Sequence, residues 1–534
     1  ASTATEKSSF RAVTTAFSPA IQLLLSPSTA DSMKSAIFSP KDSIMNFRII
    51  LYILGWVLNM EALFMLLPFA VGLVYGENTA YAFLISSLIC AAVGVPIVFR
   101  RPKNMIFYLR EGFTAVALCW IVLSIFGCLP FIINREIPNF TDALFETVSG
   151  FTTTGASVVS DVEIFSHCSL FWRSFTHWIG GMGVLVFLLA VLPLAGGSQM
   201  NLMRAESPGP AVDKLVPKTR YTALILYMLY ILLSVLEFLF LFAGGMSAFD
   251  AITITFGTAG TGGFGIRNSS MADYSPYLQW VVAIFMALFG VNFNVYFLLL
   301  IKKWRQALRS EELRTYLIIL AAAVGIIFWN TYIPGETIEE GLRHAVFQVS
   351  SIMTTTGFAT CDFALWPALS QTILVLLMFI GACAGSTGGG LKVSRIIILA
   401  KRAREELRRY LYPGSVTKIR LERKIVSSEI VHTTSAFLVA YIFIFAASTL
   451  LISIDGHDTT TGFTAVAATI NNIGPGLELV GPSQNYGFFS DFSKYILIFD
   501  MLAGRLELFP MLLLFHPKIW RKSGFAPKNH LQRI

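Results

Sequence analysis

Long apolar runs separated by short polar links dominate this chain. Five runs contain the roughly 20 residues that a helix needs to cross a hydrocarbon core about 30 Å thick: Phe113–Ile133, Tyr221–Ala243, Leu278–Ile301, Ser435–Ile454 and Tyr495–Phe515. Five more approach this length or carry one polar interruption: Ile49–Tyr75, Tyr81–Phe99, Phe171–Ala195, Tyr316–Ile333 and Trp366–Ala384. The pattern therefore predicts an all-α membrane protein with about ten spans.

The composition excludes a soluble globular protein. Only 13% of the 534 residues are charged and 55% are hydrophobic, whereas about a quarter of the residues in a soluble domain are charged. Four of the six cysteines lie in apolar runs, where a thiol packs as a small hydrophobic group: Cys90, Cys119, Cys128 and Cys383. The sequence has no Cys-x-x-Cys pair, so neither a zinc site nor a redox pair is indicated.

The net charge of +8 is concentrated in alternate loops. Lys and Arg gather in the stretches 100–110, 302–314 and 392–424 and in the C-terminal tail. The loops between them carry acidic residues instead: Glu77, Asp161, Glu163, Glu336, Glu339, Glu340, Asp455 and Asp458. By the positive-inside rule, the basic loops and both termini face the cytoplasm. The charge thus indicates orientation in a lipid bilayer, and we expect no nucleic-acid partner.

A short segment with one fixed spacing occurs four times between the apolar runs. Each copy opens about ten helical residues, too few to cross a bilayer, and reaches a glycine 13 residues after its first residue. The four pairs are Asp142 and Gly155, Asp250 and Gly263, His344 and Gly357, and Thr461 and Gly474. Asp142 stands where we expect the N-cap of the first of these helices. We therefore predict four half-helices that enter the membrane and turn back at these glycines.

The sequence TTTG occurs three times, but the spacing separates its copies. Thr152–Gly155 and Thr354–Gly357 fall at the ends of the first and third half-helices. Thr459–Gly462 falls at the start of the fourth, whose own loop is Asn471–Gly476. The same four letters are thus predicted to have two different structural roles.

The repeated unit is a span, a half-helix, a glycine loop and a second span. We expect four such units around one pore, preceded by a two-helix hairpin. The expected boundaries are 1–44 for a leader or disordered tail, 45–104 for the hairpin, 105–200, 201–305, 306–415 and 416–520 for the four units, and 521–534 for a cytoplasmic tail. The third unit includes a glycine-rich loop.

Four equivalent loops at membrane depth can form a cation site. Non-helical backbone there leaves polar groups without partners unless it lines a cavity or is buried in protein. A ring of backbone carbonyls replaces the hydration shell of a cation, as in potassium-selective pores, and glycine tolerates the sharp corners. The candidate K⁺ filter is Thr153, Thr154, Gly155, Thr261, Gly262, Gly263, Thr355, Thr356, Gly357, Asn472, Ile473 and Gly474. The alternative is that the loops merely connect spans.

The loop sequences resemble those of a known family. Phe151–Gly155, Thr261–Phe264, Thr354–Phe358 and Asn471–Gly476 look like the four filter loops of the Trk/Ktr/HKT superfamily of potassium transporters. The flanking sequences Trp172–Gly183, Gly385–Lys392 and Met501–Glu507 are similar to its bacterial TrkH branch, and the resemblance covers about 46–520. It implies a potassium channel or transporter subunit of the cell membrane, with K⁺ as the transported ion and no organic cofactor. It also implies a homodimer and a cytosolic nucleotide-binding regulator of the TrkA type.

The identity of the corner residues bears on which cation is transported. In this superfamily a serine at the first glycine position marks sodium-type members, and here Gly155 occupies it. In the second loop either Gly262 or Gly263 could form the corner, and the 13-residue spacing favours Gly263. The resemblance therefore favours potassium. A sodium-permeable member and the pore subunit of an ATP-driven potassium pump are the alternatives, although no ATPase motif lies on this chain.

The resemblance also implies a gate. Five glycines in residues 381–390 are hard to hold in a helix, and the family pattern makes this stretch an intramembrane gating loop; a kinked helix is the alternative. Its candidate residues are Gly381, Gly385, Ser386, Thr387, Gly388, Gly389 and Gly390. Arg505 lies inside a predicted span, where a charge is costly, and the family pattern faces it toward the ion path. A salt bridge with Asp500, Glu507 or Glu237 is the alternative for Arg505.

Two glycine-rich sequences imitate nucleotide-binding motifs. Gly260–Gly265 matches G-x-G-x-x-G but follows a predicted half-helix instead of a strand. Gly385–Gly390 resembles a phosphate-binding loop, but Leu391 stands where that motif has lysine. A membrane-embedded enzyme would need acid, base or metal ligands at one depth, and the sequence offers no such group. We therefore expect no enzymatic activity.

Overall fold

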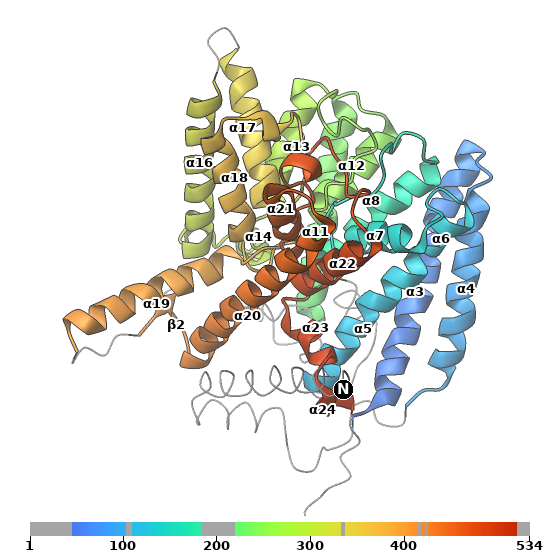
Figure 1. Cartoon of the computed structure of the whole chain (residues 1–534), viewed down its shortest axis with the longest axis horizontal. Coiled ribbons are helices and arrows are strands. Elements are labelled where there is room, and N and C mark those ends of the chain that lie inside the picture. The colour runs from blue at the N-terminus through green and yellow to red at the C-terminus, as the bar shows by residue number, and fades with distance from the viewer. Residues whose placement is uncertain are drawn as a thin grey trace, which may run out of the picture.

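The computed structural model describes residues 45–102, 109–183, 219–332, 337–413, 418–422 and 424–520. α-Helices make up most of this part of the chain (Figure 1), as the apolar runs predict. Six of its helices are long and apolar enough to cross a membrane, and a further candidate is a pair of helices bent by 92°. The predicted leader, the predicted tail and residues 184–195 of one predicted span lie outside the described residues.

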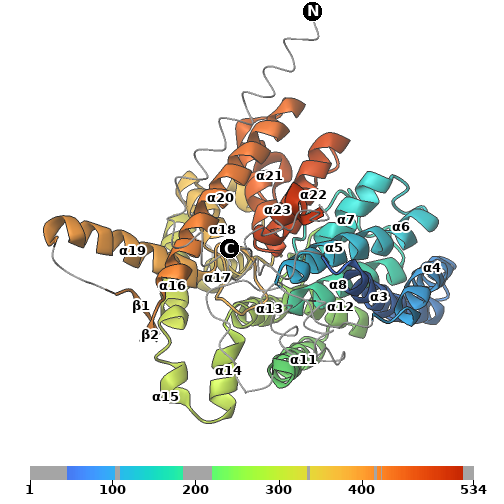
Figure 2. The same cartoon turned by 90° about the horizontal axis from the view of Figure 1, so that it is seen from below.

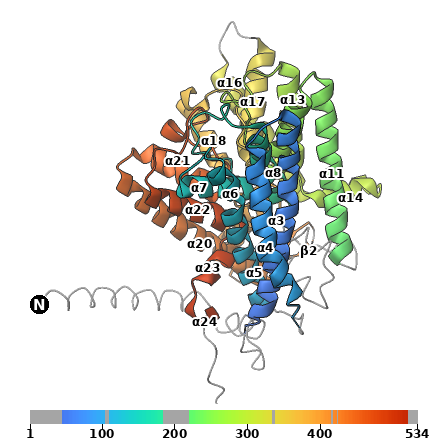
Figure 3. The ribbon, with the colours of Figure 1, turned by 90° about the vertical axis from the view of Figure 1, so that its right-hand side faces the viewer.

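The predicted N-terminal hairpin stands at one edge of the molecule (Figure 1 and Figure 3). It consists of α3 (Phe47–Tyr75) and α4 (Ala80–Phe99), which run side by side. Their close approach depends on glycine, because a Cβ atom on Gly94 would lie 2.6 Å from Asn59 Oδ1. The hairpin therefore forms a tightly packed pair, in which Ser87 of α4 also donates its hydroxyl to the Ala62 carbonyl of α3 at 2.6 Å.

Four groups of helices follow the hairpin. The first contains α5 (Leu109–Gly127), α6 (Leu129–Ile133), α7 (Phe140–Phe151) and α8 (His167–Met182). The second contains α11 (Thr219–Ala243), α12 (Ala248–Gly260), α13 (Pro276–Phe289), α14 (Phe293–Leu300) and α15 (Trp304–Ala307). The third contains α16 (Glu311–Thr331), α17 (Ile338–Met353), the 3₁₀ helix η1 (Phe363–Leu365), α18 (Ala368–Ile380) and α19 (Val393–Leu411). The fourth contains α20 (Ser428–Ile452), η2 (Ser453–Asp455), α21 (Thr459–Ile470), η3 (Glu478–Val480), α22 (Asp491–Arg505), α23 (Phe509–Leu514) and α24 (Pro517–Trp520).

A small hairpin separates the third and fourth groups. Strands β1 (Arg420–Leu421) and β2 (Lys424–Ile425) are antiparallel, with Arg420 opposite Ile425. Figure 1 shows the hairpin beside α19, which extends away from the helical body. The hairpin adds four strand residues to an otherwise helical fold.

The four groups surround a common centre (Figure 2). In the first three groups, the helix after the short helix packs on the short helix of the next group: α8 on α12, α13 on α17, and α18 on α21. In the fourth group α22 packs on α7 of the first. Because this order of contacts closes on itself, loops that are far apart in sequence meet at the centre.

Three of the four short helices begin two residues before the predicted position. Asp142, Asp250 and Thr461 are each the third residue of α7, α12 and α21. The capping residues are Asn139, Ser247 and Asp458, whose side chains accept backbone hydrogen bonds. A helix N-terminus is set by the side chain that binds its first free amides, whereas the spacing records a distance from the glycine at the other end.

The prediction that His344 opens the third short helix is wrong. α17 begins at Ile338, after Thr337, whose hydroxyl accepts a hydrogen bond from Glu340 N at 3.3 Å. α17 has 16 residues, whereas α7 has 12. α17 has additional residues at its N-terminus that the other three short helices lack. The first residue of α17 therefore cannot be located by a fixed spacing from the corner glycine.

Some predicted spans are not single helices, and two of them show what divides such a run. The run Leu278–Ile301 is divided between α13 and α14, whose axes differ by 92°. Asn292 stabilises the restart, because its side chain accepts a hydrogen bond from Asn294 N at 2.9 Å. The run Tyr495–Phe515 is divided between α22 and α23, where Leu508 has a φ of 66°. Hydropathy counts apolar residues and is blind to such breaks, so the number of ten spans stays a prediction.

Candidate functional site

The four glycine loops share one backbone conformation. Two residues before each corner the chain takes φ values of 56°, 56°, 60° and 55°, at Thr153, Thr261, Thr355 and Asn472. The corner glycines have φ values of 80°, 77°, 88° and 97°, at Gly155, Gly263, Gly357 and Gly474. The second corner is therefore Gly263, as the spacing predicts, because Gly262 does not have a positive φ.

The amide groups of these loops point back into the short helices. The residue before each corner donates its backbone N–H to a carbonyl of the preceding helix. The N–O distances are 2.9 Å for Thr154 to Ser149, 2.8 Å for Gly262 to Gly257, 2.8 Å for Thr356 to Ser351 and 2.8 Å for Ile473 to Ala468. No residue in the part of the chain that the structure describes donates a hydrogen bond to the carbonyls of these four residues. Their lone pairs are therefore free to bind a ligand.

The loops contact one another in a closed circle. A Cβ atom on Gly155 would overlap the carbonyl oxygen of Gly262 in the second loop. A Cβ atom on Gly263 would likewise overlap the carbonyl oxygen of Thr356 in the third loop, and one on Gly357 would overlap that of Ile473 in the fourth. A Cβ atom on Gly474 would lie 2.7 Å from the carbonyl oxygen of Thr154, which returns the contact to the first loop. Each corner glycine thus faces the free carbonyl of the next loop, and only a hydrogen atom fits between them.

A cavity of about 150 Å³ opens onto this circle. Its lining includes all four corner glycines, together with the side chains of Arg173 and Arg267. Its described lining contains no carboxylate. The four short helices end at the loops, so the partial negative charges of their C-termini gather there. The site therefore offers a cation neutral oxygen ligands and helix dipoles, with no acidic side chain.

Threonine hydroxyls brace the first and third loops. In each loop two threonines share a hydrogen bond of 2.8 Å: Thr152 with Thr154, and Thr354 with Thr356. The first threonine of each pair also donates to the short helix, since Thr152 Oγ1 lies 2.7 Å from the Val148 carbonyl. These side chains are fully buried and point away from water, so their role is to hold the backbone.

The second loop is braced from outside, by His177 of α8. A Cβ atom on Gly262 would overlap the imidazole ring of His177. His177 Nδ1 lies 2.8 Å from the carbonyl oxygen of Gly150 in α7, and its Nε2 accepts the amide of Phe264 at 3.3 Å. The imidazole therefore takes the place that a threonine side chain has in the first and third loops.

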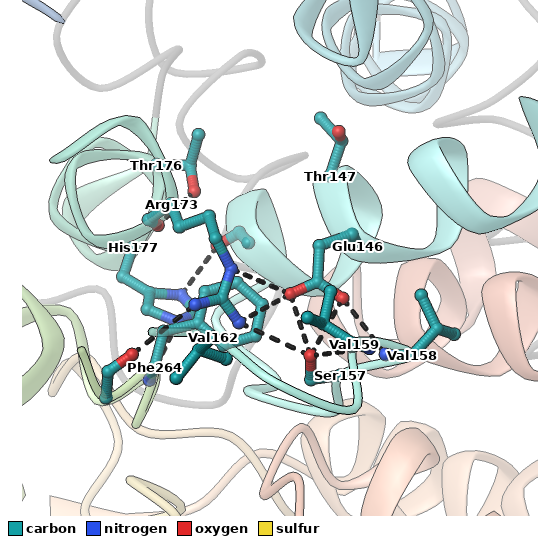
Figure 4. Close-up of polar contacts among 12 residues, drawn as sticks. Glu146, Thr147, Ser157, Val158, Val159, Val162, Arg173, Thr176, His177 and Phe264 are labelled. Atoms are coloured by element: carbon teal, nitrogen blue, oxygen red, sulfur yellow. Dashed lines mark hydrogen bonds and ion pairs between the residues drawn. The ribbon is translucent and has the colours of Figure 1, made fainter. Parts of the chain in front are cut away.

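Figure 4 shows a buried ion pair behind the first loop. Glu146 of α7 and Arg173 of α8 approach to 2.6 Å, with side chains 0% and 2% exposed. Ser157, two residues after the first corner, donates its hydroxyl to Glu146 Oε1 at 3.0 Å. This pair was not predicted from the sequence. The sequence feature that could have indicated the pair is the presence of an acidic and a basic residue in neighbouring segments at membrane depth, where an ionised group needs a partner.

The glycine-rich loop of residues 381–392 lies directly against the circle of the four glycine loops. The chain leaves the helical conformation between Ile380 and Val393. Three of the loop glycines have positive φ: Gly381, Gly385 and Gly390. The amide of Gly389 donates to Thr355 Oγ1, in the third of the four glycine loops, at 2.7 Å. The alternative of a kinked helix is wrong, because left-handed residues and amides that bond outside the segment interrupt a helix.

Arg505 connects the glycine-rich loop to α8. Its Nη1 donates to the Thr387 carbonyl at 3.0 Å, and its Nη2 donates to the Gly181 carbonyl at 2.8 Å and to that of Gly180. A guanidinium group has five N–H donors in a fixed fork, so it can hold two segments together. The described hydrogen bonds of Arg505 thus secure the main chain of the loop.

Two of the three carboxylates considered as salt-bridge partners of Arg505 have other contacts, whereas the buried carboxylate oxygens of Glu237 accept no described hydrogen bond. Glu507 pairs with Arg395 of α19. Asp500 accepts a hydrogen bond from Ser448 Oγ at 2.7 Å. The guanidinium group of Arg505 lies beside backbone carbonyls of the glycine-rich loop and of α8.

Glu312, at the start of α16, holds both ends of the glycine-rich loop. Its Oε1 accepts the amide of Ala384 at 2.7 Å and the amide of Ser394 at 3.2 Å. The residue is only 6% exposed, so water cannot replace these bonds. The role of Glu312 was not predicted, because an acidic residue in the first turn of a helix usually indicates only a favourable interaction with the helix dipole.

Comparison with known proteins relates this arrangement to a family. The family model for TrkH, a cation transport protein, matches residues 79–522. The Trk system potassium uptake proteins TrkH of Salmonella typhimurium and Escherichia coli K12 are 39% and 38% identical to the chain, over 90% of its length and all of theirs. The crystal structure of the potassium transporter TrkH from Vibrio parahaemolyticus superposes with a TM-score of 0.80 at 33% identity, covering 89% of this chain and 100% of that one. The resemblance seen in the loop sequences is thus confirmed, and the chain belongs to the TrkH family of cation transport proteins.

Proposed function

We propose that the chain is a potassium uptake transporter subunit whose four glycine loops form one cation filter. The observation that carries the proposal is the closed circle of loops, in which each corner glycine meets a free carbonyl of the next loop. Such carbonyls replace the water around a dehydrated cation. Relatives that align over their whole length are named Trk system potassium uptake proteins, which supports K⁺ as the transported ion.

The chemistry of the ring suits a weakly hydrated monovalent cation. The ligands are neutral carbonyls, and no carboxylate lies in the described lining of the cavity above them. K⁺ gives up its water more easily than Na⁺ does, so neutral dipoles are sufficient for it, and a divalent ion would require negative side chains. Glycine at all four corners, with no room for a Cβ atom, keeps the carbonyls of adjacent loops close.

The proposal includes the finer architecture expected from the sequence. Four units surround one pore, about ten segments cross the cell membrane, and both termini lie in the cytoplasm. The basic residues of α19 support this orientation under the positive-inside rule: Arg395, Lys401, Arg402, Arg404, Arg408 and Arg409. The cavity above the ring then faces outward, where it admits cations.

We assign the gate to the glycine-rich loop and Arg505. Arg505 holds the Thr387 carbonyl, and the Gly389 amide binds Thr355 of the filter, so the loop is held across the inner side of the ring. Opening then requires the loop to separate from these partners. Inward flow is driven by the membrane potential, which supplies about 2.3 kcal/mol per charge per 100 mV. The chain itself performs no catalytic step in this scheme.

The partners implied by the family resemblance belong to the same proposal. They are a second copy of the chain, as a homodimer, and a cytosolic nucleotide-binding regulatory subunit of the TrkA type. α19 supports a regulatory contact, because it extends from the helical body and is strongly basic (Figure 1). Lys401 of α19 contacts the β1–β2 hairpin through the Arg420 carbonyl at 2.7 Å, so the two elements form one surface.

Cation flux into liposomes tests the proposed function. Purified protein is reconstituted, and the uptake of radioactive Rb⁺ is measured with K⁺ or Na⁺ as competitor. We expect K⁺ to suppress Rb⁺ uptake at far lower concentration than Na⁺, and liposomes without protein to show no uptake. Equal competition by K⁺ and Na⁺, or the absence of flux in both closed and gate-disrupted protein, would contradict the proposal.

A further inference from the structure

The ion pair of Glu146 and Arg173 is the most completely buried pair of charges beside the filter. Arg173 Nε and Nη2 both donate to Glu146 Oε1, at 2.8 and 2.6 Å. Their side chains are 2% and 0% exposed. Burying two charges is costly unless they are paired and all their hydrogen-bonding groups are occupied. We therefore looked for a role of this ion pair other than packing, in the contacts that the two side chains make.

Glu146 fastens the chain on the outer side of the first filter loop. Both of its carboxylate oxygens accept the hydroxyl of Ser157, at 3.0 and 3.1 Å, and Oε2 accepts the amide of Val158 at 3.0 Å. Ser157 follows Gly155 by two residues. The carboxylate thus ties the segment after the corner back to α7, the helix that leads into the same loop (Figure 4).

Arg173 extends this link to the second filter loop. Its guanidinium carbon lies 4.1 Å from the ring centre of Phe264, and Nη1 donates to the Gly265 carbonyl at 3.4 Å. Phe264 directly follows the corner Gly263. One turn later on α8, His177 receives the Phe264 amide at 3.3 Å. Arg173 therefore connects the Glu146 carboxylate, which holds the first loop, to the residues that follow the corner of the second loop.

Only the first unit has this arrangement. Glu146 precedes its corner glycine by nine residues, and the residues at the same offset in the other units are Ile254, Gln348 and Ala465. Gln348 is neutral and donates to the Cys361 carbonyl at 3.3 Å. A charged link therefore stands at one of the four junctions of the ring, between the first and second loops.

We propose that Glu146 and Arg173 act together as positioning residues for ion selectivity, by fixing the junction between the first and second filter loops. This inference rests on the proposed cation filter. Gly155 meets the Gly262 carbonyl at that junction without room for a Cβ atom, so a small displacement of either loop changes the spacing of carbonyls around the ion. A ring with looser spacing adapts to the smaller Na⁺ and discriminates less.

The arginine also lines the cavity above the ring, so its charge could act on entering cations directly. The two effects have different signatures. With a direct electrostatic effect, the rate of cation uptake changes in opposite directions when the positive and the negative residue of the pair are neutralised. A positioning effect appears whichever partner is removed, and it changes the preference for K⁺ over Na⁺.

The experiment compares charge states of the pair in reconstituted full-length protein. The variants are Glu146→Gln, Arg173→Gln and the double variant, each assayed for Rb⁺ uptake with K⁺ or Na⁺ as competitor. We expect all three to lose about tenfold in K⁺ over Na⁺ preference, and the double variant to lose no more than either single one, because both members of a pair act as a unit. The double variant contains no unpaired buried charge, so it remains informative if a single variant does not fold.

Two further variants complete the test. Arg267→Gln removes another arginine that lines the cavity but is 41% exposed and pairs with Asp250 at 3.7 Å; we expect its selectivity to match that of the wild type. Ser157→Ala removes one contact of Glu146 and leaves the ion pair, and we expect a smaller loss of selectivity than for the double variant.

Three outcomes separate the possibilities. Unchanged selectivity in all pair variants would overturn the inference while leaving the filter intact. Opposite changes in uptake rate for Glu146→Gln and Arg173→Gln, with selectivity unchanged, would also overturn it and would assign the pair a direct electrostatic role. A wild-type protein that does not prefer K⁺ would instead overturn the proposed function on which the inference rests.

Discussion

Asn472 donates a hydrogen bond of 2.9 Å from its side-chain amide to the hydroxyl of Thr154, and so joins the fourth glycine loop to the first. The same amide donates to the Met501 carbonyl of α22, also at 2.9 Å. Asn472 and Thr154 are both fully buried. The loop whose sequence departs most from TTTG therefore braces itself on a threonine of its neighbour, and this contact completes the circle.

Replacing Asn472 by alanine should weaken both the fold and the selectivity. The Met501 carbonyl would lose a donor in a buried site, which costs about 1–3 kcal/mol. The fourth loop would also lose its link to Thr154. We expect a lower unfolding temperature in detergent and a loss of K⁺ over Na⁺ preference in Rb⁺ uptake by liposomes.

Asn485→Ala provides the matched control. Asn485 lines the same cavity, but its side chain accepts only the nearby Gly487 amide, at 2.9 Å, among the bonds that the structure describes. We expect little change in selectivity. Equal losses in the two variants would show that the Asn472 link has no special role.

Serine at Gly155 should be far more harmful than serine at Gly462, although both glycines end a TTTG sequence. A Cβ atom on Gly155 would overlap the Gly262 carbonyl, and its φ of 80° costs a non-glycine residue about 1–2 kcal/mol. Gly462 lies in the first turn of α21, and no described atom outside its own stretch of helix lies within 4 Å of the position that its Cβ atom would take. We expect Gly155→Ser to reduce K⁺ preference in the uptake assay.

Gly462→Ser should leave uptake unchanged and should not lower stability, since serine favours a helix over glycine by a few tenths of a kcal/mol. If Gly155→Ser kept wild-type selectivity, the first corner would not belong to the filter. If both variants were equally impaired, the difference in backbone role between the two TTTG copies would be irrelevant to transport.

These two glycines show what the sequence could predict. A corner that needs a positive φ and has no room for a Cβ atom accepts only glycine, so a fixed spacing to glycine is a local signal, and it identified Gly263 correctly. The long apolar helices α3, α4 and α20 were found for a similar reason, because lipid contact requires an unbroken apolar run.

Other parts could not be predicted because their determinants meet only in the folded chain. His344 was misplaced since the start of α17 depends on Thr337, which the spacing from the glycine ignores. Glu146 and Arg173 are far apart in sequence and come together through the packing of α7 on α8. The hold of Glu312 on the glycine-rich loop spans an even longer stretch of chain.

Replacing Glu312 by glutamine should release the glycine-rich loop. The carboxylate accepts the amides of Ala384 and Ser394, and a hydrogen bond to a charged group contributes about 1.5–3 kcal/mol. Glutamine keeps the size but loses the charge and part of the acceptor capacity. We expect faster basal Rb⁺ uptake in the absence of any partner protein.

Glu311→Gln is the control for this change. Glu311 is the preceding residue, but it pairs with Lys401 near the surface, where its side chain is 39% exposed. An exposed pair contributes at most about 1 kcal/mol. We expect wild-type basal uptake from this variant; an equal rise in both would indicate a general loosening of α16 and α19.

Replacing Arg505 by alanine should also raise basal flux, through the other side of the same loop. The variant removes the donors that hold the Thr387 and Gly181 carbonyls and the positive charge beside the glycine-rich loop. Arg402→Ala is the control. Arg402 of α19 donates a hydrogen bond to Ser435 of α20 at 2.7 Å, so this substitution removes an arginine from a contact between helices that lies outside the glycine-rich loop. Unchanged flux in Arg505→Ala would leave the arginine with a structural role only.

Acid should weaken the link between the N-terminal hairpin and α8. Glu77 follows α3 and accepts the His167 amide at 2.7 Å and the Cys168 amide at 3.1 Å. Burial acts to raise the pKa of Glu77, but the hydrogen bonds from His167 and Cys168 outweigh it, so its pKa is lowered from the ordinary value.

A carboxylate with a lowered folded-state pKa stabilises the fold fully above its unfolded pKa of about 4.3, and this contribution disappears as the pH falls through the folded value. We therefore expect the unfolding temperature of the wild type to exceed that of Glu77→Gln near pH 7, and the difference to shrink as the pH falls below about 4. Unfolding curves in detergent from pH 7 to pH 3 measure this difference, and a constant or growing gap on acidification would contradict the assignment.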